Sequence, residues 1–196
     1  MTAIDLGVGL QRPIHRPARA SIVDWLTTTD HKRIGILYIS SAFGFFAIGG
    51  ILALIIRAQL VQPGLSVVSN ETYDQVFTMH GTIMLLFFAT PMFAGFANYL
   101  VPLQIGAADM SFPRLNALSY WLFLFGGLVT LSGFATASGA ADTGWTGYAP
   151  LTLGQYTPGP GLDLWIVGVA MVGASGILGA VNFMATIYAR RAPGLA

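Results

Sequence analysis

Four long runs of apolar residues alternate with polar stretches along this chain. Each run is long enough to cross a bilayer core about 30 Å thick, which takes about 20 helical residues. Because lipid offers no partner to backbone N–H and C=O groups, we expect each run to be an α-helix. The pattern predicts an all-α membrane protein with four transmembrane helices, at about residues 34–56, 76–100, 117–137 and 164–187.

The segments outside these runs are short and polar. Residues 1–33 contain basic residues and two prolines, without the apolar run and cleavage site of a signal peptide, so we expect a retained arm. Within it, residues 21–29 favour a short surface helix with Ile22, Trp25 and Leu26 facing lipid headgroups. Residues 188–196 form the polar end of the chain.

Composition and charge narrow the possibilities further. Hydrophobic residues make up 55% of the chain and charged residues only 9%, which excludes an ordinary soluble domain. The absence of cysteine excludes disulfides and thiolate metal sites, so any metal must be held by His, Met or oxygen. If the helices alternate in direction, every basic residue except Arg57 falls on one side. The positive-inside rule then places both termini in the cytoplasm.

His80 is an imidazole about one helical turn inside the second apolar run. An ionisable side chain at that depth is costly without a partner and indicates a functional site. A hydrogen bond to a neighbouring helix, worth about 1 kcal/mol or less, would explain it. Axial ligation of a haem would explain it equally well, because neutral imidazole is a common haem ligand. The position of the residue leaves both interpretations open.

Two further features have an ordinary explanation and a functional one. The long loop after the third run contains Trp145, Tyr148 and Tyr156, which are typical of an aromatic belt at the membrane surface, although such a loop can also cover a cofactor. Small residues predict close helix packing at Gly44, Gly49, Gly50, Gly126, Gly127, Gly173, Gly176 and Gly179.

Several motifs, in order, resemble subunit I of the haem-copper oxidases, in the cytochrome c oxidase branch. The resemblance runs from Asp24 to the end of the chain. Its motifs are Asp30-His31-Lys32-Arg33-Ile34-Gly35, Phe77-Thr78-Met79-His80-Gly81, Asn98-Tyr99-Leu100-Val101-Pro102-Leu103, Ile105-Gly106-Ala107-Ala108-Asp109-Met110 and Thr143-Gly144-Trp145-Thr146. The family has twelve membrane helices, so the resemblance implies that the four predicted here are its first four and that the chain is truncated at Ala196.

The resemblance assigns roles around a low-spin haem a. It implies that His80 is one axial ligand of the iron, that Arg57 donates a hydrogen bond to the haem formyl group, and that Tyr73 and Trp145 lie near the propionates. The ordinary alternative for Arg57 is a cation at a helix end that reaches toward the headgroups. For Tyr73 and Trp145 the ordinary alternative is the aromatic belt.

The resemblance also implies the entrance of a proton pathway. Asp109 corresponds to the acid at its cytoplasmic mouth, although a solvated loop aspartate is the commoner case. The other residues that correspond to this pathway are Asn98, Asn116, Tyr38, Ser119 and Ser175. The oxygen-reducing centre, with its high-spin haem and copper, would lie beyond Ala196, so we expect this chain alone to be inactive.

As part of a complete oxidase in a bacterial plasma membrane, the chain would contact the remaining helices of subunit I, subunits II and III, and cytochrome c or a cytochrome c domain. No nucleic-acid partner is expected. Gln59 stands where many relatives have a glutamate, which argues against an outer cation site. Ile48, Leu52 and Thr72 stand where quinol-using relatives carry polar or charged residues, which favours cytochrome c as donor. A quinol oxidase fragment, or a scaffold without haem, remains the alternative.

Overall fold

The computed structural model describes residues 21–64 and 66–195, and every regular element in these ranges is helical. Four helices or helix combinations are long and apolar enough to span a membrane, which confirms the predicted all-α fold with four spans. The elements are α1 (Ile22–Leu26), α2 (His31–Gln59), α3 (Asn70–Thr82), η1 (Ile83–Ala89), α4 (Thr90–Gln104), α5 (Pro113–Ser132), η2 (Gly133–Ala135) and α6 (Pro160–Ala189).

The helices begin earlier than the apolar runs predicted. The Asp30 carboxylate accepts from the backbone N–H groups of Lys32 and Arg33 and caps α2. Ser69 caps α3 in the same way. α5 and α6 begin at prolines, whose missing N–H costs nothing in the first helical turn. Hydropathy therefore located the spans, but capping side chains in two of them and prolines in the other two mark where the helices begin. The third helical segment also ends slightly early, at Ala135 instead of residue 137.

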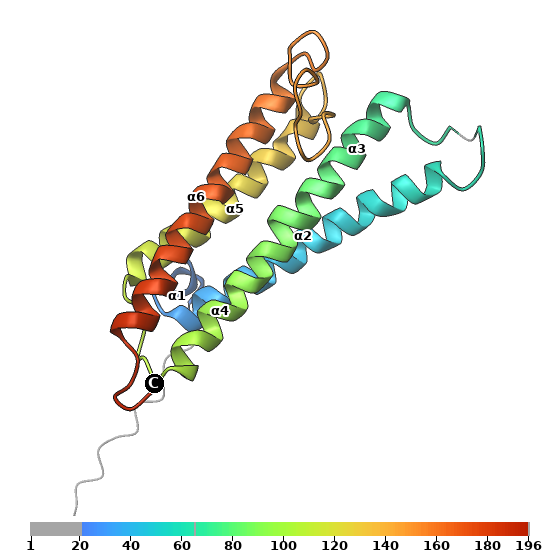
Figure 1. Ribbon diagram of the computed structural model, residues 1–196. Helices are drawn as coiled ribbons and strands as arrows, with labels where there is room; N and C mark the ends of the chain where they lie inside the picture. Colours follow the sequence, from blue (N-terminus) through green and yellow to red (C-terminus); the bar gives the residue numbers. More distant parts are fainter. Residues whose placement is uncertain (1–20, 65, 196) are drawn as a thin grey trace, which may run out of the picture.

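The helices form two pairs (Figure 1). α2 lies beside the continuous rod of α3, η1 and α4, while α5 lies beside α6. In each pair glycine lets the backbones approach: a Cβ at Gly35 would lie 2.8 Å from the Gly95 carbonyl oxygen, and one at Gly126 would lie 2.9 Å from that of Gly168. The fully buried ring of Phe123 packs against those of Phe45 and Phe87 and joins the two pairs.

The prediction that small residues mark close packing was only partly right. Gly49, Gly126 and Gly127 do face other helices closely. In the described part of the chain, nothing lies within 4 Å of a Cβ placed at the four outward-facing glycines, Gly44, Gly50, Gly173 and Gly176. A Cβ at Gly179 would meet only Phe183 of the same helix, at 3.9 Å. Sequence shows that a residue is small, but not which way it faces.

The second span contains a π-helical segment, Ile83–Ala89, just before Pro91. A proline removes one helical hydrogen bond and crowds the carbonyl four residues earlier. Here the Thr90 N–H bonds back to the Leu85 carbonyl, five residues earlier, and the Thr90 hydroxyl donates to the same oxygen at 2.9 Å. The wider turn accommodates the proline and rotates the residues before it, including His80, relative to α4.

The predicted surface helix exists but is shorter, Ile22–Leu26. Ile22 and Leu26 are exposed, as predicted, whereas Trp25 is partly buried, with the Arg33 guanidinium 5.6 Å from its ring centre. Residues 1–20 of the predicted arm lie outside the described residues.

Candidate functional site

His80 is fixed in one orientation by α2. Its Nδ1 lies 2.9 Å from the carbonyl oxygen of Gly49, and the ring is partly buried. Because a carbonyl only accepts, Nδ1 must carry the proton, and in the neutral ring Nε2 keeps its lone pair. Within the described part of the chain, no hydrogen bond reaches Nε2. Metal-ligating histidines have one nitrogen held by a carbonyl in this way, and so do histidines that only join two helices.

The long loop between α5 and α6 reaches the helix that carries His80 (Figure 1). The backbone N–H of Gly144 donates to the Thr78 hydroxyl at 2.9 Å. Trp145 packs on Gly81, where a Cβ would lie 3.2 Å from the indole Cδ1. The structure thus brings Trp145 to the residue next to His80, and Trp145 remains 45% exposed, which agrees with an aromatic belt as well as with a loop that covers a site.

A second contact fixes the same helix from α6. The indole N–H of Trp165 donates to the Thr82 hydroxyl at 2.9 Å, and this hydroxyl donates to the Thr78 carbonyl at 2.8 Å. Trp165 and Thr82 are both buried. Sequence reasoning missed this pair, although a tryptophan and a threonine within apolar runs are each a signal that a buried polar atom needs a partner.

Arg57 and Tyr73 are not joined to His80. Among the described residues, no hydrogen bond or ion pair is formed by the Arg57 guanidinium, which is exposed in the last turn of α2. Tyr73 stacks on Phe77, with ring centres 6.4 Å apart, in the first half of the same span. Arg57 lies eight residues beyond Gly49, which is about 12 Å along the helix.

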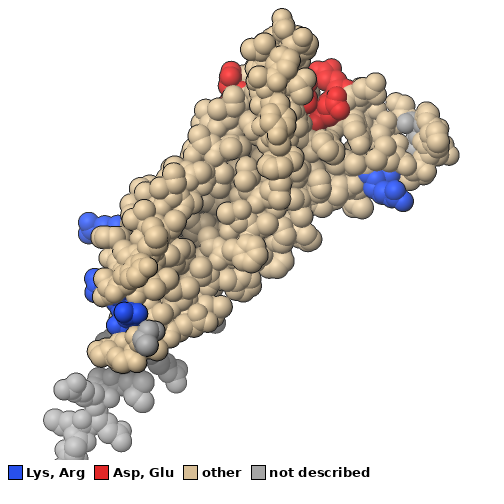
Figure 2. All heavy atoms as spheres, viewed as in Figure 1, with Lys and Arg blue, Asp and Glu red and all other residues tan. Residues whose placement is uncertain are grey.

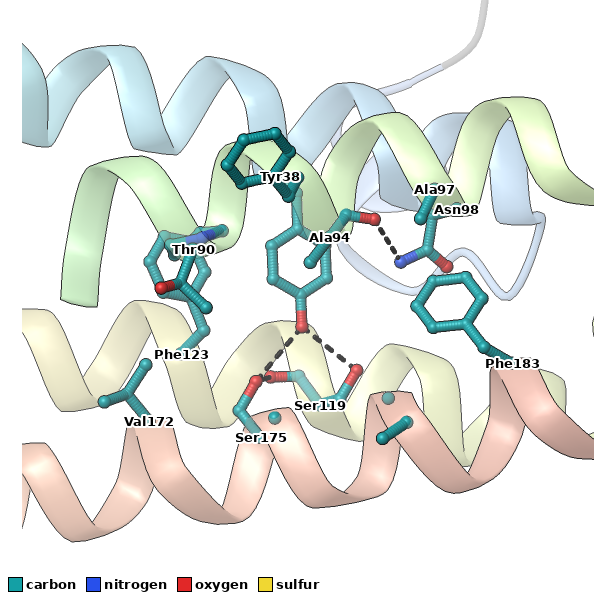
Figure 3. Close-up of a pocket in the computed structure, with 15 residues that line it drawn as sticks. Tyr38, Thr90, Ala94, Ala97, Asn98, Ser119, Phe123, Val172, Ser175 and Phe183 are labelled. Carbon is teal, nitrogen blue, oxygen red and sulfur yellow. Dashed lines mark hydrogen bonds between the residues drawn. The ribbon is translucent and has the colours of Figure 1, made fainter. Parts of the chain in front are cut away.

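A polar cluster lies between the helix pairs, nearer the other end of the molecule. The Tyr38 hydroxyl donates to Ser119 Oγ at 3.0 Å and lies 3.1 Å from Ser175 Oγ (Figure 3). Ser119 in turn donates to the Asn116 carbonyl at 2.8 Å. These residues come from α2, α5 and α6 and are all buried. The structure therefore brings together the predicted residues Tyr38, Ser119, Ser175 and Asn116.

Two asparagines near this cluster have buried polar atoms without a partner. Asn98 uses its Nδ2 on the Ala94 carbonyl, but its Oδ1 is unpaired, and Asn116 has neither side-chain atom paired. Both residues are 1% exposed. Asn98, Tyr38 and Ser119 line one cavity of about 300 Å³ (Figure 3). An unpaired buried amide beside a cavity, such as that of Asn98, is a site that ordered water can satisfy.

Asp109 lies in the connection between α4 and α5, the two helices that carry Asn98 and Asn116. Its side chain is partly buried, and its Oδ1 accepts from the N–H of Met110 at 2.7 Å. One carboxylate oxygen thus holds the turn, while the described chain gives Oδ2 no hydrogen-bond donor.

His31 is a polar residue of this region that sequence reasoning did not single out. It is the first residue of α2, is 1% exposed, and places Nδ1 at 2.8 Å from the Asn98 carbonyl oxygen. In the sequence His31 follows an aspartate typical of a helix N-cap, so the histidine is easily taken for an ordinary residue of the first helical turn.

Four residues were used above to predict the electron donor and the outer cation site, and in the structure each takes part in packing, capping or loop closure. Gln59 accepts the backbone N–H groups of Val67 and Val68 at 2.7 and 3.0 Å, and so closes the loop after α2. Leu52 is buried and Ile48 packs against the core. Thr72 lies in the capped first turn of α3.

Most of the Lys and Arg side chains visible in Figure 2 lie toward the end of the molecule where α6 ends, whereas the visible Asp and Glu side chains and one further basic group lie toward the opposite end. Arg57 is the one basic residue between Ile34 and Pro113. Among the basic residues in the described part of the chain, the asymmetry predicted from the sequence is therefore present in three dimensions.

Comparison with known proteins identifies the family. The family model for Cytochrome C and Quinol oxidase polypeptide I matches residues 33–196. A Streptomyces coelicolor protein named as a cytochrome c oxidase subunit 1-beta is 58% identical over 181 residues, which cover 92% of this chain and 32% of the relative. The cytochrome c oxidase subunit 1 of Corynebacterium glutamicum is 52% identical over 195 residues, covering 98% of this chain and 33% of the relative. The chain thus spans about a third of the length of these relatives, and it belongs to the family of cytochrome c and quinol oxidase polypeptide I as a membrane protein matching the amino-terminal part.

Proposed function

We propose that this chain is the haem-binding and proton-collecting amino-terminal part of subunit I in a proton-pumping cytochrome c oxidase, which reduces oxygen to water. The observation that carries the proposal is the hydrogen bond from His80 Nδ1 to the Gly49 carbonyl, 2.9 Å long, which aims a free Nε2 away from α2. A histidine that only joins two helices makes the same bond, as His31 does with the Asn98 carbonyl, so the ligand assignment depends on the Nε2 left unpaired in the described chain together with the family to which the chain belongs.

The residues around His80 fit a low-spin haem a. Gly49 fixes the tautomer of His80, and Trp145 packs at Gly81 beside it. The resemblance to the oxidases assigns Arg57, on the neighbouring α2, to the formyl group and Tyr73, on α3 with His80, to a propionate group; both side chains carry a hydrogen-bond donor. When bound, the haem would supply reversible one-electron transfer, and a donor at its formyl group would raise its reduction potential. The second axial ligand, the high-spin haem and copper are assigned to the remaining helices.

The polar cluster supports proton uptake from the cytoplasmic side. Asp109 collects protons at the mouth, and the unpaired amides of Asn98 and Asn116 hold water between it and Tyr38. Ser119 and Ser175 extend the hydrogen-bonded path from the Tyr38 hydroxyl. The end with most basic residues then faces the cytoplasm, with both ends of this chain, as the positive-inside rule requires.

Cytochrome c is the proposed electron donor, in a bacterial plasma membrane with subunits II and III as partners. The positions that would serve a quinol are apolar or engaged: Leu52 is buried in the core, and Thr72 lies in a capped helix turn. Oxidase assays with reduced cytochrome c and with a quinol test this choice directly. Turnover with quinol alone would reject it.

The first experiment is a reduced-minus-oxidised visible spectrum of the complete complex that contains this chain, in wild type and His80→Ala. We expect His80→Ala to lose the low-spin haem band. His31→Asn is the matched control, because it removes another buried imidazole from the same helix bundle and leaves His80 untouched. A wild-type complex without haem would support the scaffold alternative, and an unchanged band in His80→Ala would reject the ligand assignment.

The proton assignment is tested separately with Asp109→Asn. We expect the haem spectrum to stay unchanged while turnover falls at least about tenfold, because an amide cannot release a proton to the path. Asp142→Asn, a carboxylate bonded to Thr157 in the α5–α6 loop, is the control and should leave turnover near wild type. Equal turnover in wild type and Asp109→Asn would remove Asp109 from the proposed path.

A further inference from the structure

Pro102 leaves a gap in the hydrogen bonding of α4. It lies inside the helix and has no backbone N–H. The carbonyl that this N–H would serve in an α-helix is four residues earlier, at Asn98. Asn98 is buried, so its carbonyl cannot turn to bulk water for a substitute.

His31 supplies the missing donor. Its Nδ1 lies 2.8 Å from the Asn98 carbonyl oxygen, and its ring is 1% exposed. Because the carbonyl can only accept, Nδ1 carries the proton of the neutral imidazole. The ring is placed by the first turn of α2, where Asp30 caps the helix. Pro102 on α4 removes a donor and His31 on α2, 71 residues earlier in the sequence, replaces it.

The same residue, Asn98, carries the side chain with the unpaired buried Oδ1. Its Nδ2 bonds to the Ala94 carbonyl at 2.9 Å, so the direction of Oδ1 depends on where this turn of α4 is held. Asn98 lines one cavity together with Tyr38 and Ser119, so the place of its amide beside that cavity depends on the backbone at Asn98 staying in position.

We propose that His31 is a positioning residue for proton uptake. Its Nδ1–H donates to the Asn98 carbonyl, which lacks a helical donor because of Pro102, and so keeps the Asn98 amide in place within the proposed proton pathway. The inference rests on the proposed proton function of this cluster. The His31 imidazole transfers no proton in this proposal; it only donates a fixed hydrogen bond.

The test uses three substitutions at His31 in the complete oxidase. In His31→Asn the side-chain amide N–H takes the place of Nδ1–H and can still donate to the Asn98 carbonyl. In His31→Gln the amide N–H lies near the place of Nε2 and cannot reach that carbonyl. His31→Leu has no donor. We expect His31→Leu and His31→Gln to slow proton uptake about tenfold, because a buried carbonyl loses its partner and the turn relaxes. His31→Asn should stay within about twofold of wild type. Uptake is followed with a pH dye during single turnover.

A second set of variants gives the Asn98 carbonyl a donor from within α4. In Pro102→Ala the new N–H reaches the Asn98 carbonyl, so the helix no longer needs His31. Adding His31→Leu to Pro102→Ala should then change proton uptake by less than about twofold, a coupling that additive damage does not produce. If His31 only contributed to packing, His31→Leu would slow proton uptake equally in the wild type and in Pro102→Ala.

The outcomes separate this inference from the proposed function. If Asp109→Asn slows turnover but proton uptake is the same in His31→Gln and His31→Asn, the positioning role of His31 is wrong and the proposed proton pathway is retained. If His31→Asn is as slow as His31→Leu, the imidazole itself is needed and the hydrogen bond is not the reason. If Asp109→Asn has no effect, the proton pathway fails regardless of His31.

Discussion

The region around His80 and the region around Tyr38 use buried polar groups in opposite ways. Around His80, the polar side chains of Thr78, Thr82 and Trp165 all have partners, from three different segments of the chain. Around Tyr38, the amides of Asn98 and Asn116 keep buried atoms unpaired.

The difference has a physical meaning. A fully paired buried network fixes one geometry, which suits a side chain that must present one nitrogen at one angle. Unpaired buried atoms cost free energy unless water satisfies them, which suits a path along which protons move through water. Both patterns agree with the proposed function, which needs a fixed ligand in the first region and bound water in the second.

The largest expected effect comes from removing Trp165, which fixes the His80 region. Trp165→Ala should destabilise the complex by about 3–5 kcal/mol, the usual cost of emptying a large buried site. Trp165→Phe keeps most of the volume and loses mainly the bond to Thr82, so it should cost about 1 kcal/mol. Thermal unfolding midpoints compare the two variants. Equal losses would mean that packing volume is not what fixes the region.

Crowding the backbone behind His80 comes next. A Cβ at Gly49 would lie 2.8 Å from Met84 Sδ, so Gly49→Leu should overpack the site, cost about 1–3 kcal/mol and reduce the haem content. Gly50→Leu is the matched control, because nothing lies within 4 Å of a Cβ at that position in the described chain. Haem per protein, measured from a pyridine extract, reports the result. A loss that is the same at both glycines would contradict the role of the Gly49 contact.

A pair of polar deletions compares the two regions directly. Thr82→Val leaves the buried Trp165 N–H without its acceptor and should cost about 1–2 kcal/mol. Asn116→Leu removes two unpaired atoms, so stability should be unchanged or higher, while proton uptake slows. Unfolding midpoints and single-turnover uptake test both variants. If Asn116→Leu destabilised as much as Thr82→Val, the amide would be structural.

The smallest effect is expected at Asp30, which caps the helix that carries His31. Partial burial acts to raise the pKa of this carboxyl, but bonds from the Lys32 and Arg33 N–H groups outweigh it and lower the pKa below the ordinary value. The cap therefore stabilises the folded state fully above about pH 4 and less as the pH falls through the lowered pKa.

Asp30→Ala should accordingly cost about 1 kcal/mol at neutral pH and flatten the loss of stability in acid. Asp30→Asn keeps a capping oxygen without the charge and should cost less. Unfolding midpoints at pH 7 and well below pH 4 provide the measurement, because the contribution of the cap is lost only in that acid range. An unchanged acid response in Asp30→Ala would show that this carboxyl does not contribute to it.

The spans were predictable from the sequence, because lipid requires long apolar helices and hydropathy measures just that. The start of each helix was not, since caps such as Asp30 and Ser69 lie outside the apolar runs. The π segment before Pro91 was also not predicted, because a proline indicates a disturbed helix without saying how the chain accommodates it.

Residue identity alone marked His80, since an imidazole in an apolar run needs a partner. It also marked Asp109, Asn98 and Asn116 through the resemblance to oxidases. Only the tertiary structure decided that Gly49 holds the His80 ring, that Trp145 lies against Gly81, and that His31 serves the carbonyl left free by Pro102. Each of these contacts joins segments far apart in the chain, and the sequence records the chemistry of a donor or acceptor but not the partner that folding brings to it.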